Sequence, residues 1–97
     1  MRAKKRLDFS EDALFDIADI GFFYAVERGN VKAAENVELA LFCAAEKLEY
    51  TPEIGRPGSV EGTRELVVSA YPYILIYKLT ASRVIVLNII HQAMKYP

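Results

Sequence analysis

Few side chains in this sequence could perform acid–base or nucleophilic chemistry. The chain holds one histidine, His91, and one cysteine, Cys43. A histidine with a free pKa near ~6.5 is a possible general base, but His91 ends an apolar run, where a partly buried ring bonded to backbone is the more common arrangement. Cys43 lies in the middle of a predicted helix without a local base, so we expect a buried thiol. No second histidine and no cysteine cluster stand at ligand spacing, so neither a metal nor a cofactor is expected.

The remaining polar candidates are one arginine and a group of tyrosines. Arg64, next to Glu65, fits two roles equally well, a clamp for an anion or half of a cross-strand ion pair. Tyrosines could stack on nucleic-acid bases, but in a sheet they usually pack, so we favour packing for Tyr71, Tyr73 and Tyr77. No motif among these residues specifies catalysis.

Three apolar runs in the second half of the chain predict the strands that must position these groups. The runs are residues 63–69, 73–79 and 83–91, and the loops between them are short enough for hairpins. They therefore predict an antiparallel meander. Pro57-Gly58, before the first run, fits the two central positions of a type II turn, where the second residue needs positive φ.

The first half of the chain predicts a short strand at residues 6–9 and then two helices. Ser10 is a good N-cap for the first helix, and Gly29 is a natural end for it. Asn30 can cap the second helix at once, and Thr51-Pro52 ends it, because the residue before proline avoids helical backbone. The predicted apolar stripe of the first helix is Leu14, Ile17, Gly21 and Tyr24.

These elements predict an α+β fold for a single domain of residues 1–97. An N-terminal strand precedes an antiparallel helical hairpin, which packs on one face of a mainly antiparallel sheet of three to four strands. Pairing the hairpins around their loops sets Leu66 opposite Tyr77 and Tyr77 opposite about Val86. Arg64 and His91 then lie on the order of 20 Å apart at ~3.3 Å per strand residue, too far to share one small active site.

Composition bounds the kinds of partner. The net charge is −1 and the pI is near 5.8, with acids concentrated in residues 7–53 and bases before and after them. Tight, sequence-independent binding to nucleic acid is therefore not expected, and charge favours a protein partner. The longest apolar runs are too short to span a bilayer and the basic start has no hydrophobic stretch after it, so we expect a cytoplasmic protein.

The second half of the chain also carries a series of motifs. They are Pro52-x-x-Gly55-Arg56-Pro57-Gly58, Gly62-Thr63-Arg64-Glu65-Leu66, Tyr71-Pro72-Tyr73-Ile74-Leu75-Ile76-Tyr77 and a final His91-x-Ala93. Together with the strand and the two helices before them, these motifs resemble the RelE/ParE superfamily of toxins over essentially the whole chain. The motifs are fairly specific, whereas the helices alone are not.

The resemblance implies one of two activities on the same fold. RelE-like members cut messenger RNA on the ribosome with basic residues on the central strands and an arginine and a tyrosine near the C-terminus. ParE-like members poison DNA gyrase and have no known catalysis of their own. By rough alignment, the positions of the RelE-like cations hold Glu65, Val67, Ile74 and Ala93.

Without those cations, little would stabilise charge developing on a phosphate. The chain also ends at Pro97, before the RelE-like terminal tyrosine. Other RNA-cutting relatives use a C-terminal His-Tyr pair, which the spacing of His91 and Tyr96 matches poorly. The resemblance thus favours a gyrase-poisoning toxin with no catalytic residues of its own. A ribosome-dependent endoribonuclease is the alternative, and a member that has lost its toxicity is a third possibility.

The resemblance further implies a small ParD-like antitoxin whose flexible C-terminal half folds onto the toxin in a hetero-oligomer. The exposed side of the helical hairpin is the expected receptor, although its aromatics could instead complete the core. The candidate antitoxin contacts are Leu14, Phe22, Phe23, Tyr24 and Phe42. The candidate contacts with the target are Arg64, Tyr77, Arg83, His91, Lys95 and Tyr96.

Overall fold

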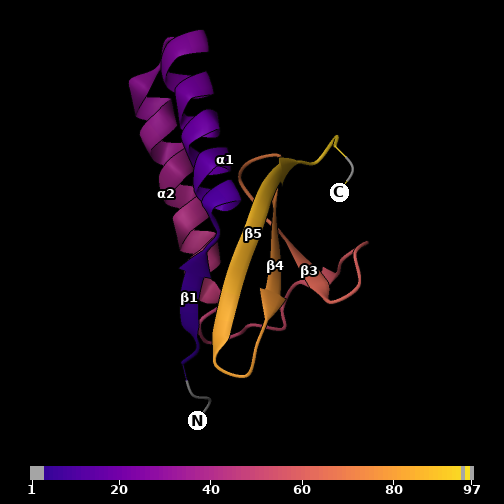
Figure 1. Cartoon of the computed structure of the whole chain (residues 1–97). Coiled ribbons are helices and arrows are strands. Elements are labelled where there is room, and N and C mark those ends of the chain that lie inside the picture. The colour runs from indigo at the N-terminus through magenta and orange to yellow at the C-terminus, as the bar shows by residue number, and fades with distance from the viewer. Residues whose placement is uncertain (1–3, 95, 97) are drawn as a thin grey trace.

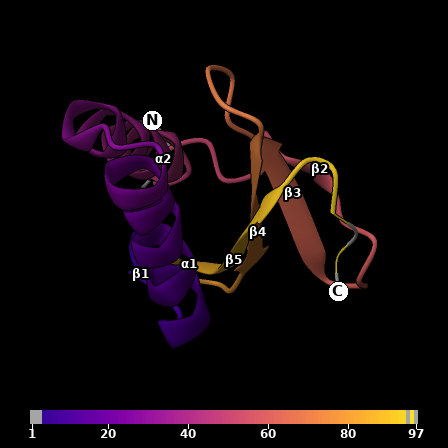
Figure 2. The same ribbon diagram turned by 90° about the horizontal axis from the view of Figure 1, so that it is seen from above.

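A computed structural model describes residues 4–94 and 96 of the chain as two helices packed on a five-stranded sheet. The strand order is β1-β5-β4-β3-β2, in which β1 runs parallel to β5 and every other neighbour is antiparallel. Both helices lie together on one side of the sheet (Figures 1 and 2). The elements are β1 (Arg6–Phe9), α1 (Glu11–Phe22), the π-helical turn η1 (Phe23–Glu27), α2 (Val31–Lys47), β2 (Arg56–Pro57), β3 (Thr63–Val67), β4 (Tyr73–Leu79) and β5 (Arg83–His91). The predicted α+β fold is confirmed.

The sheet has one strand more than expected, because Arg56–Pro57 pairs with β3. The predicted type II turn at Pro57-Gly58 is wrong, since the glycines with positive φ among the described residues are Gly29 and Gly62. Gly58 instead donates its N–H to the carbonyl oxygen of Thr63 at 2.8 Å, which closes the β2–β3 connection. The left-handed residue of this connection is Gly62, at φ 84°.

Both predicted helix caps are confirmed. The Ser10 hydroxyl accepts a hydrogen bond from the N–H of Ala13 at 3.0 Å, and the Asn30 side chain accepts one from the N–H of Ala33 at 2.9 Å. Gly29 has φ 63°, the left-handed conformation that commonly ends a helix. The second helix ends at Lys47, four residues before the predicted end, and the Thr51 hydroxyl donates to the Lys47 carbonyl oxygen at 2.7 Å.

The core lies between the helices and the inner face of β4 and β5. The buried face of α1 differs from prediction at one position, because Ala13 is fully buried while the Leu14 side chain is 50% exposed. Of the described helices, none is long and apolar enough to span a membrane. The main core cluster consists of Ala13, Ile17, Ile20, Val37, Leu41, Ala44, Ala45, Val68, Tyr73, Leu75, Val86 and Ile89.

The strand register partly differs from prediction. Tyr77 lies opposite Val86, as expected, beside an irregularity between Ile76 and Tyr77. The β3–β4 pair is shifted by two residues, so that Arg64, not Leu66, lies opposite Tyr77. The reason is a tight connection in which the Val68 N–H bonds to the carbonyl oxygen of Tyr73 at 3.0 Å, so the chain reverses earlier than predicted.

Candidate functional site

The outer face of the sheet, away from the helices, holds a cavity of about 260 Å³ beside the C-terminal segment that follows β5. Two of the positions where the resemblance predicts RelE-like cations, Glu65 and Ile74, line it. Arg56 is the one cation among its described lining residues, and its Nε and Nη2 atoms both lie 3.0 Å from Glu65 Oε1. The cation in this cavity is therefore already paired with a carboxylate of the same chain. The lining residues are Arg56, Ser59, Glu65, Ile74, Ile90, Gln92, Met94 and Tyr96.

The C-terminal segment folds back to form one wall of this cavity. The Tyr96 hydroxyl donates to Asn88 Oδ1 at 2.9 Å, and the Ser59 hydroxyl donates to the Tyr96 carbonyl oxygen at 2.5 Å. These two bonds tie Tyr96 to β5 and to the β2–β3 connection. Lys95, a predicted target contact, lies outside the described residues.

A neighbouring cavity of about 380 Å³ brings together His91 and Tyr96 with two carboxylates of α1, Asp16 and Asp19. Asp16 Oδ2 accepts hydrogen bonds from the Ile89 N–H at 2.9 Å and from the Asn88 side chain at 3.2 Å. The structure thus brings His91 and Tyr96 to one cavity, although their spacing in the sequence argued against a functional pair.

His91 is exposed rather than partly buried, which corrects the prediction, but its predicted bond to backbone is present. Its Nδ1 atom accepts the N–H of Ala93 at 3.1 Å. In a neutral ring this bond assigns the proton to Nε2. The edge of the ring meets Tyr73, with 5.8 Å between ring centroids. The ring orientation is fixed from two sides.

Two predicted target contacts have structural roles. Tyr77 is fully buried, so its candidacy as a surface contact is wrong. Its hydroxyl donates to the Pro52 carbonyl oxygen at 2.8 Å and accepts the Gly55 N–H at 3.0 Å. Arg64 donates to the carbonyl oxygen of Gly55 at 2.7 Å and to that of Glu53 at 3.3 Å, a role that neither prediction for it anticipated. Both side chains hold the connection before β2.

Tyr73 and Tyr77 pack in the core, as predicted for tyrosines of this sheet. Burial raises the pKa of Tyr73 to about 12, and a hydrogen bond and the charge of Tyr24 add to the shift. Burial also raises the pKa of Tyr77, against the opposing effects of its bond to Gly55 and of the nearby Arg64. Both phenols are neutral at physiological pH.

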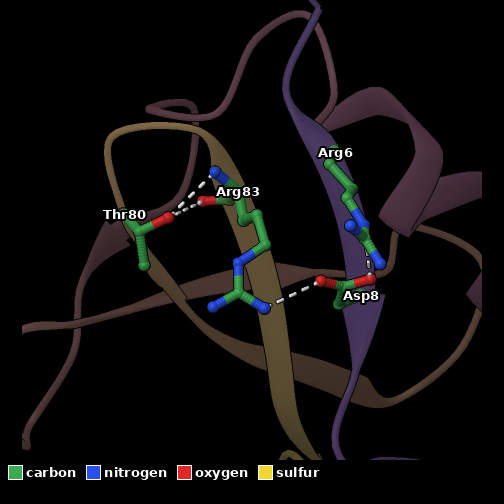
Figure 3. Close-up of polar contacts among 4 residues, drawn as sticks. All are labelled: Arg6, Asp8, Thr80 and Arg83. Atoms are coloured by element: carbon green, nitrogen blue, oxygen red, sulfur yellow. Dashed lines mark hydrogen bonds and ion pairs between the residues drawn. The ribbon is translucent and has the colours of Figure 1, made fainter.

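Arg83 begins β5 at the opposite end of the outer face. Its Nη1 atom lies 3.1 Å from Asp8 Oδ2, and Arg6 Nε lies 3.3 Å from Asp8 Oδ1 (Figure 3). The carboxylate of Asp8 thus sits between two guanidinium groups from neighbouring strands. Arg83 is exposed and available to a partner.

Most predicted antitoxin contacts lie on the outer side of the helices. The exposed fractions are 50% for Leu14, 60% for Phe22, 38% for Phe23 and 37% for Phe42. Tyr24 is the exception, because it is partly buried and packs against the core and Tyr71. Tyr24 is therefore less accessible than the other four side chains, and its contact with an antitoxin stays a prediction.

Cys43 is exposed, which corrects the expected burial of its thiol. Within residues 4–94 and 96, no three histidine, cysteine or acidic side chains gather closely enough to hold a metal ion. Sequence reasoning missed Asp16, Ser59 and Asn88 as parts of the two cavities. Asn88 could have been found from the sequence, because it is a polar residue within an otherwise apolar strand.

Comparison with known proteins identifies the family. Residues 7–96 match the model of the ParE toxin of the type II toxin–antitoxin system parDE. The chain is 32% identical over 95 residues to Y4kP, a predicted toxin of Sinorhizobium fredii (strain NBRC 101917 / NGR234), covering 98% of this chain and 96% of that protein.

Two solved structures share the fold. One is the chromosomal ParDE toxin–antitoxin system from P. aeruginosa, with a TM-score of 0.82, 21% identity and coverage of 91% of this chain and 96% of the other. The second is the toxin–antitoxin complex RelBE2 from Mycobacterium tuberculosis, with a TM-score of 0.68, 18% identity and coverage of 97% and 98%. Because the family model matches residues 7–96, nearly the whole chain, this chain belongs to the ParE family of type II toxins.

Proposed function

We propose that this ParE-family toxin poisons DNA gyrase in the cytoplasm without catalysis of its own, and that a ParD-like antitoxin neutralises it. The observation that carries the proposal is the pairing of Arg56 with Glu65 in the outer cavity. Cleavage of RNA there would need preorganised cations to stabilise the charge that develops on the phosphate. The described wall of this cavity offers one cation, and a carboxylate 3.0 Å away already balances it.

The experiment compares two activities of the purified chain. With gyrase and supercoiled plasmid, we expect inhibition of supercoiling and accumulation of cleavage complexes. With programmed ribosomes, we expect intact messenger RNA. Cleavage of messenger RNA together with normal gyrase activity would overturn the proposal. Induced expression that leaves growth unchanged would instead assign the chain to the class that has lost its toxicity.

The surface proposed for gyrase consists of the predicted target contacts that remain accessible. Arg83 and His91 are exposed, and Tyr96 is partly exposed. Arg83 and His91 lie at opposite ends of β5, and His91 shares a cavity with Asp16 and Asp19 of α1, so a partner that contacts them all must extend along the whole of β5. A large protein target is compatible with such a footprint, because specific interfaces bury about 800 Å² on each partner.

The surface proposed for the antitoxin is the apolar stripe on the outer side of α1. Leu14, Ala18 and Phe22 recur every four residues, and Phe15 lies beside them at 67% exposure. A stripe of this period fits a segment that lays apolar side chains along a helix, as disordered segments do when they fold on binding. Both similar solved structures are toxin–antitoxin systems by name, which supports such a partner.

The antitoxin surface is tested with Phe22→Asp and the matched control Ile54→Asp. Ile54 is also an exposed apolar residue, at 50%, but it lies beside β3, away from α1. We expect Phe22→Asp to remain toxic and to escape neutralisation by the co-expressed antitoxin, while Ile54→Asp stays neutralised. Equal neutralisation of both variants would contradict the assignment of this surface.

A second candidate function, ribosome-dependent RNA cleavage, is favoured by one observation. His91, Tyr96 and the Asp16 carboxylate line a single cavity, and such groups can move protons. If this cavity were catalytic, His91→Ala would reduce the rate of messenger RNA cleavage on ribosomes by about 10²-fold or more. We instead expect that the unmodified chain cleaves no messenger RNA. We also expect that His91→Ala still inhibits gyrase, with any loss of inhibition caused by weaker contact with gyrase.

A further inference from the structure

The outer face of the sheet carries a cluster of like charges where β1, β5 and β4 meet. Arg6 and Arg83 are direct neighbours in the parallel β1–β5 register, and Asp8 and Lys78 both lie beside Ile85 in the next row. Like charges side by side on adjacent strands destabilise a sheet unless an anion lies between them. Asp8 supplies that anion, with one carboxylate oxygen on each guanidinium group.

The charges in this cluster do not balance. Three cations, Arg6, Arg83 and Lys78, face one carboxylate, so two positive charges remain uncompensated. In the described part of the chain, Lys78 is exposed and forms no ion pair. The Arg6 and Arg83 side chains are 76% and 45% exposed. Each guanidinium has five N–H donors and donates one of them to Asp8, so donors remain for an outside anion.

The frame of the cluster is fixed by the β4–β5 turn. Lys5 Nζ donates to the carbonyl oxygens of Thr80 and Ala81 at 2.8 and 3.0 Å. The Thr80 hydroxyl accepts the N–H of Arg83 at 2.9 Å, as Figure 3 shows. These bonds hold the turn against the start of β1. The spacing between Arg6 and Arg83 is therefore set by the sheet rather than by flexible loops.

We propose that Arg6, Arg83 and Lys78 bind the phosphodiester backbone of nucleic acid held by the toxin's target. The three cations span two strand spacings, about 10 Å, and a duplex presents one charge per ~1.7 Å of its axis. Two uncompensated charges at separate positions need two anions, which a phosphodiester backbone supplies in one molecule. Arginine suits this contact because its planar donors match phosphate geometry.

The surroundings of the cluster favour phosphates over an acidic protein. In the described residues, the exposed large apolar side chains lie on the helices, on β3, in loops and near the C-terminus, and none lies on β1, β4 or β5. A protein interface normally has an apolar centre, whereas phosphate contacts need only charge. The contact is weak and salt-dependent, in keeping with a chain whose net charge is −1.

The test measures the anisotropy of fluorescent duplex DNA of about 20 base pairs, and of single-stranded RNA of similar length, over ~20–150 mM KCl. For two to three phosphate contacts on duplex DNA, log K should fall against log salt with a slope of about −2 to −3. Arg83→Gln should reduce the magnitude of this slope by about 1. Asp8→Asn, which removes the internal anion, should tighten binding. Each variant is checked for an unchanged fold by circular dichroism.

Lys32→Gln is the matched control, because Lys32 is exposed on α2 and its loss changes the net charge equally. Equal weakening by Arg83→Gln and Lys32→Gln, or no binding at the lowest salt, would overturn the proposal. Polyglutamate that competes as well as DNA per charge would also overturn it and assign the cluster to an acidic protein. Preference for DNA or for RNA identifies the source of the phosphates. The assay contains neither gyrase nor ribosomes, so its failure leaves the proposed function standing.

Discussion

The buried hydroxyl of Tyr77 gives the sharpest prediction about stability. Tyr77 and Pro52 are fully buried, and the hydroxyl bridges the Pro52 carbonyl oxygen and the Gly55 N–H. Tyr77→Phe removes both bonds while keeping the ring. No other described group bonds to either backbone atom, so both would stay buried without a partner.

The magnitude follows from those two backbone atoms. A buried polar group left unsatisfied costs about 1–3 kcal/mol, and the Tyr77 hydroxyl satisfies two of them. We therefore expect Tyr77→Phe to lower the free energy of unfolding by about 2–4 kcal/mol. For a domain of this size, that corresponds to a fall in Tm of roughly 10–25 °C.

The assay is urea unfolding followed by circular dichroism, with Tyr50→Phe as the control. Tyr50 is 54% exposed, and its hydroxyl has no hydrogen bond among the described residues, so its loss should change stability by less than about 0.5 kcal/mol. A loss below about 1 kcal/mol for Tyr77→Phe would refute the reasoning. Arg64→Gln offers a further check, because Arg64 holds the carbonyl oxygen of the same Gly55. Its effect should be non-additive with that of Tyr77→Phe.

Three further predictions concern two glycines and one phenol. A Cβ on Gly55 would meet the Tyr77 hydroxyl and, at 2.8 Å, a backbone oxygen of β3, so Gly55→Ala should destabilise the fold by at least about 2 kcal/mol in urea unfolding. Gly29 has φ 63° and open space around it, so Gly29→Ala should cost only about 1 kcal/mol, from backbone strain alone; equal losses would contradict this distinction. Because the pKa of Tyr73 rises from 10.0 to about 12 on folding, its stabilising contribution is complete below pH 10 and is lost as the pH rises to 12. Unfolding in urea at several pH values should show a fall over this window to which Tyr73 contributes about 3 kcal/mol, and Tyr73→Phe should remove that contribution while leaving the one from the raised pKa of Tyr77.

Features encoded within a few neighbouring residues were predictable. Ser10 and Asn30 each cap a helix through an atom three residues away, so their type and position suffice. The ends of β4 and β5 follow from apolar runs bounded by turn residues, and both were predicted correctly. In each case the interaction that fixes the structure is local.

Features that depend on distant residues were missed. Arg56–Pro57 has no strand pattern, and it becomes β2 only because β3 offers an edge to pair with. The β3–β4 register was wrong because the sequence does not show where the chain reverses. His91 and Tyr96 meet in one cavity only because Ser59 and Asn88 tie the C-terminal segment back. The spacing of residues in the sequence does not predict these bonds.

The run Tyr73–Tyr77 combines a locally predictable strand with a packing arrangement that depends on distant residues. All five residues are buried, although successive side chains of a strand point to opposite faces and the helices cover only one face. Ile74 and Ile76, on the outer face, are 6% and 0% exposed. Ile74 lines the same cavity as Tyr96 and Arg56, so the C-terminal segment and β2 act as the second cover. An unbroken apolar run in a central strand of an antiparallel sheet thus indicates that both faces of the strand are covered. In this chain the cover on the outer face is formed by β2 and the C-terminal segment, the parts whose sequence shows the weakest periodicity.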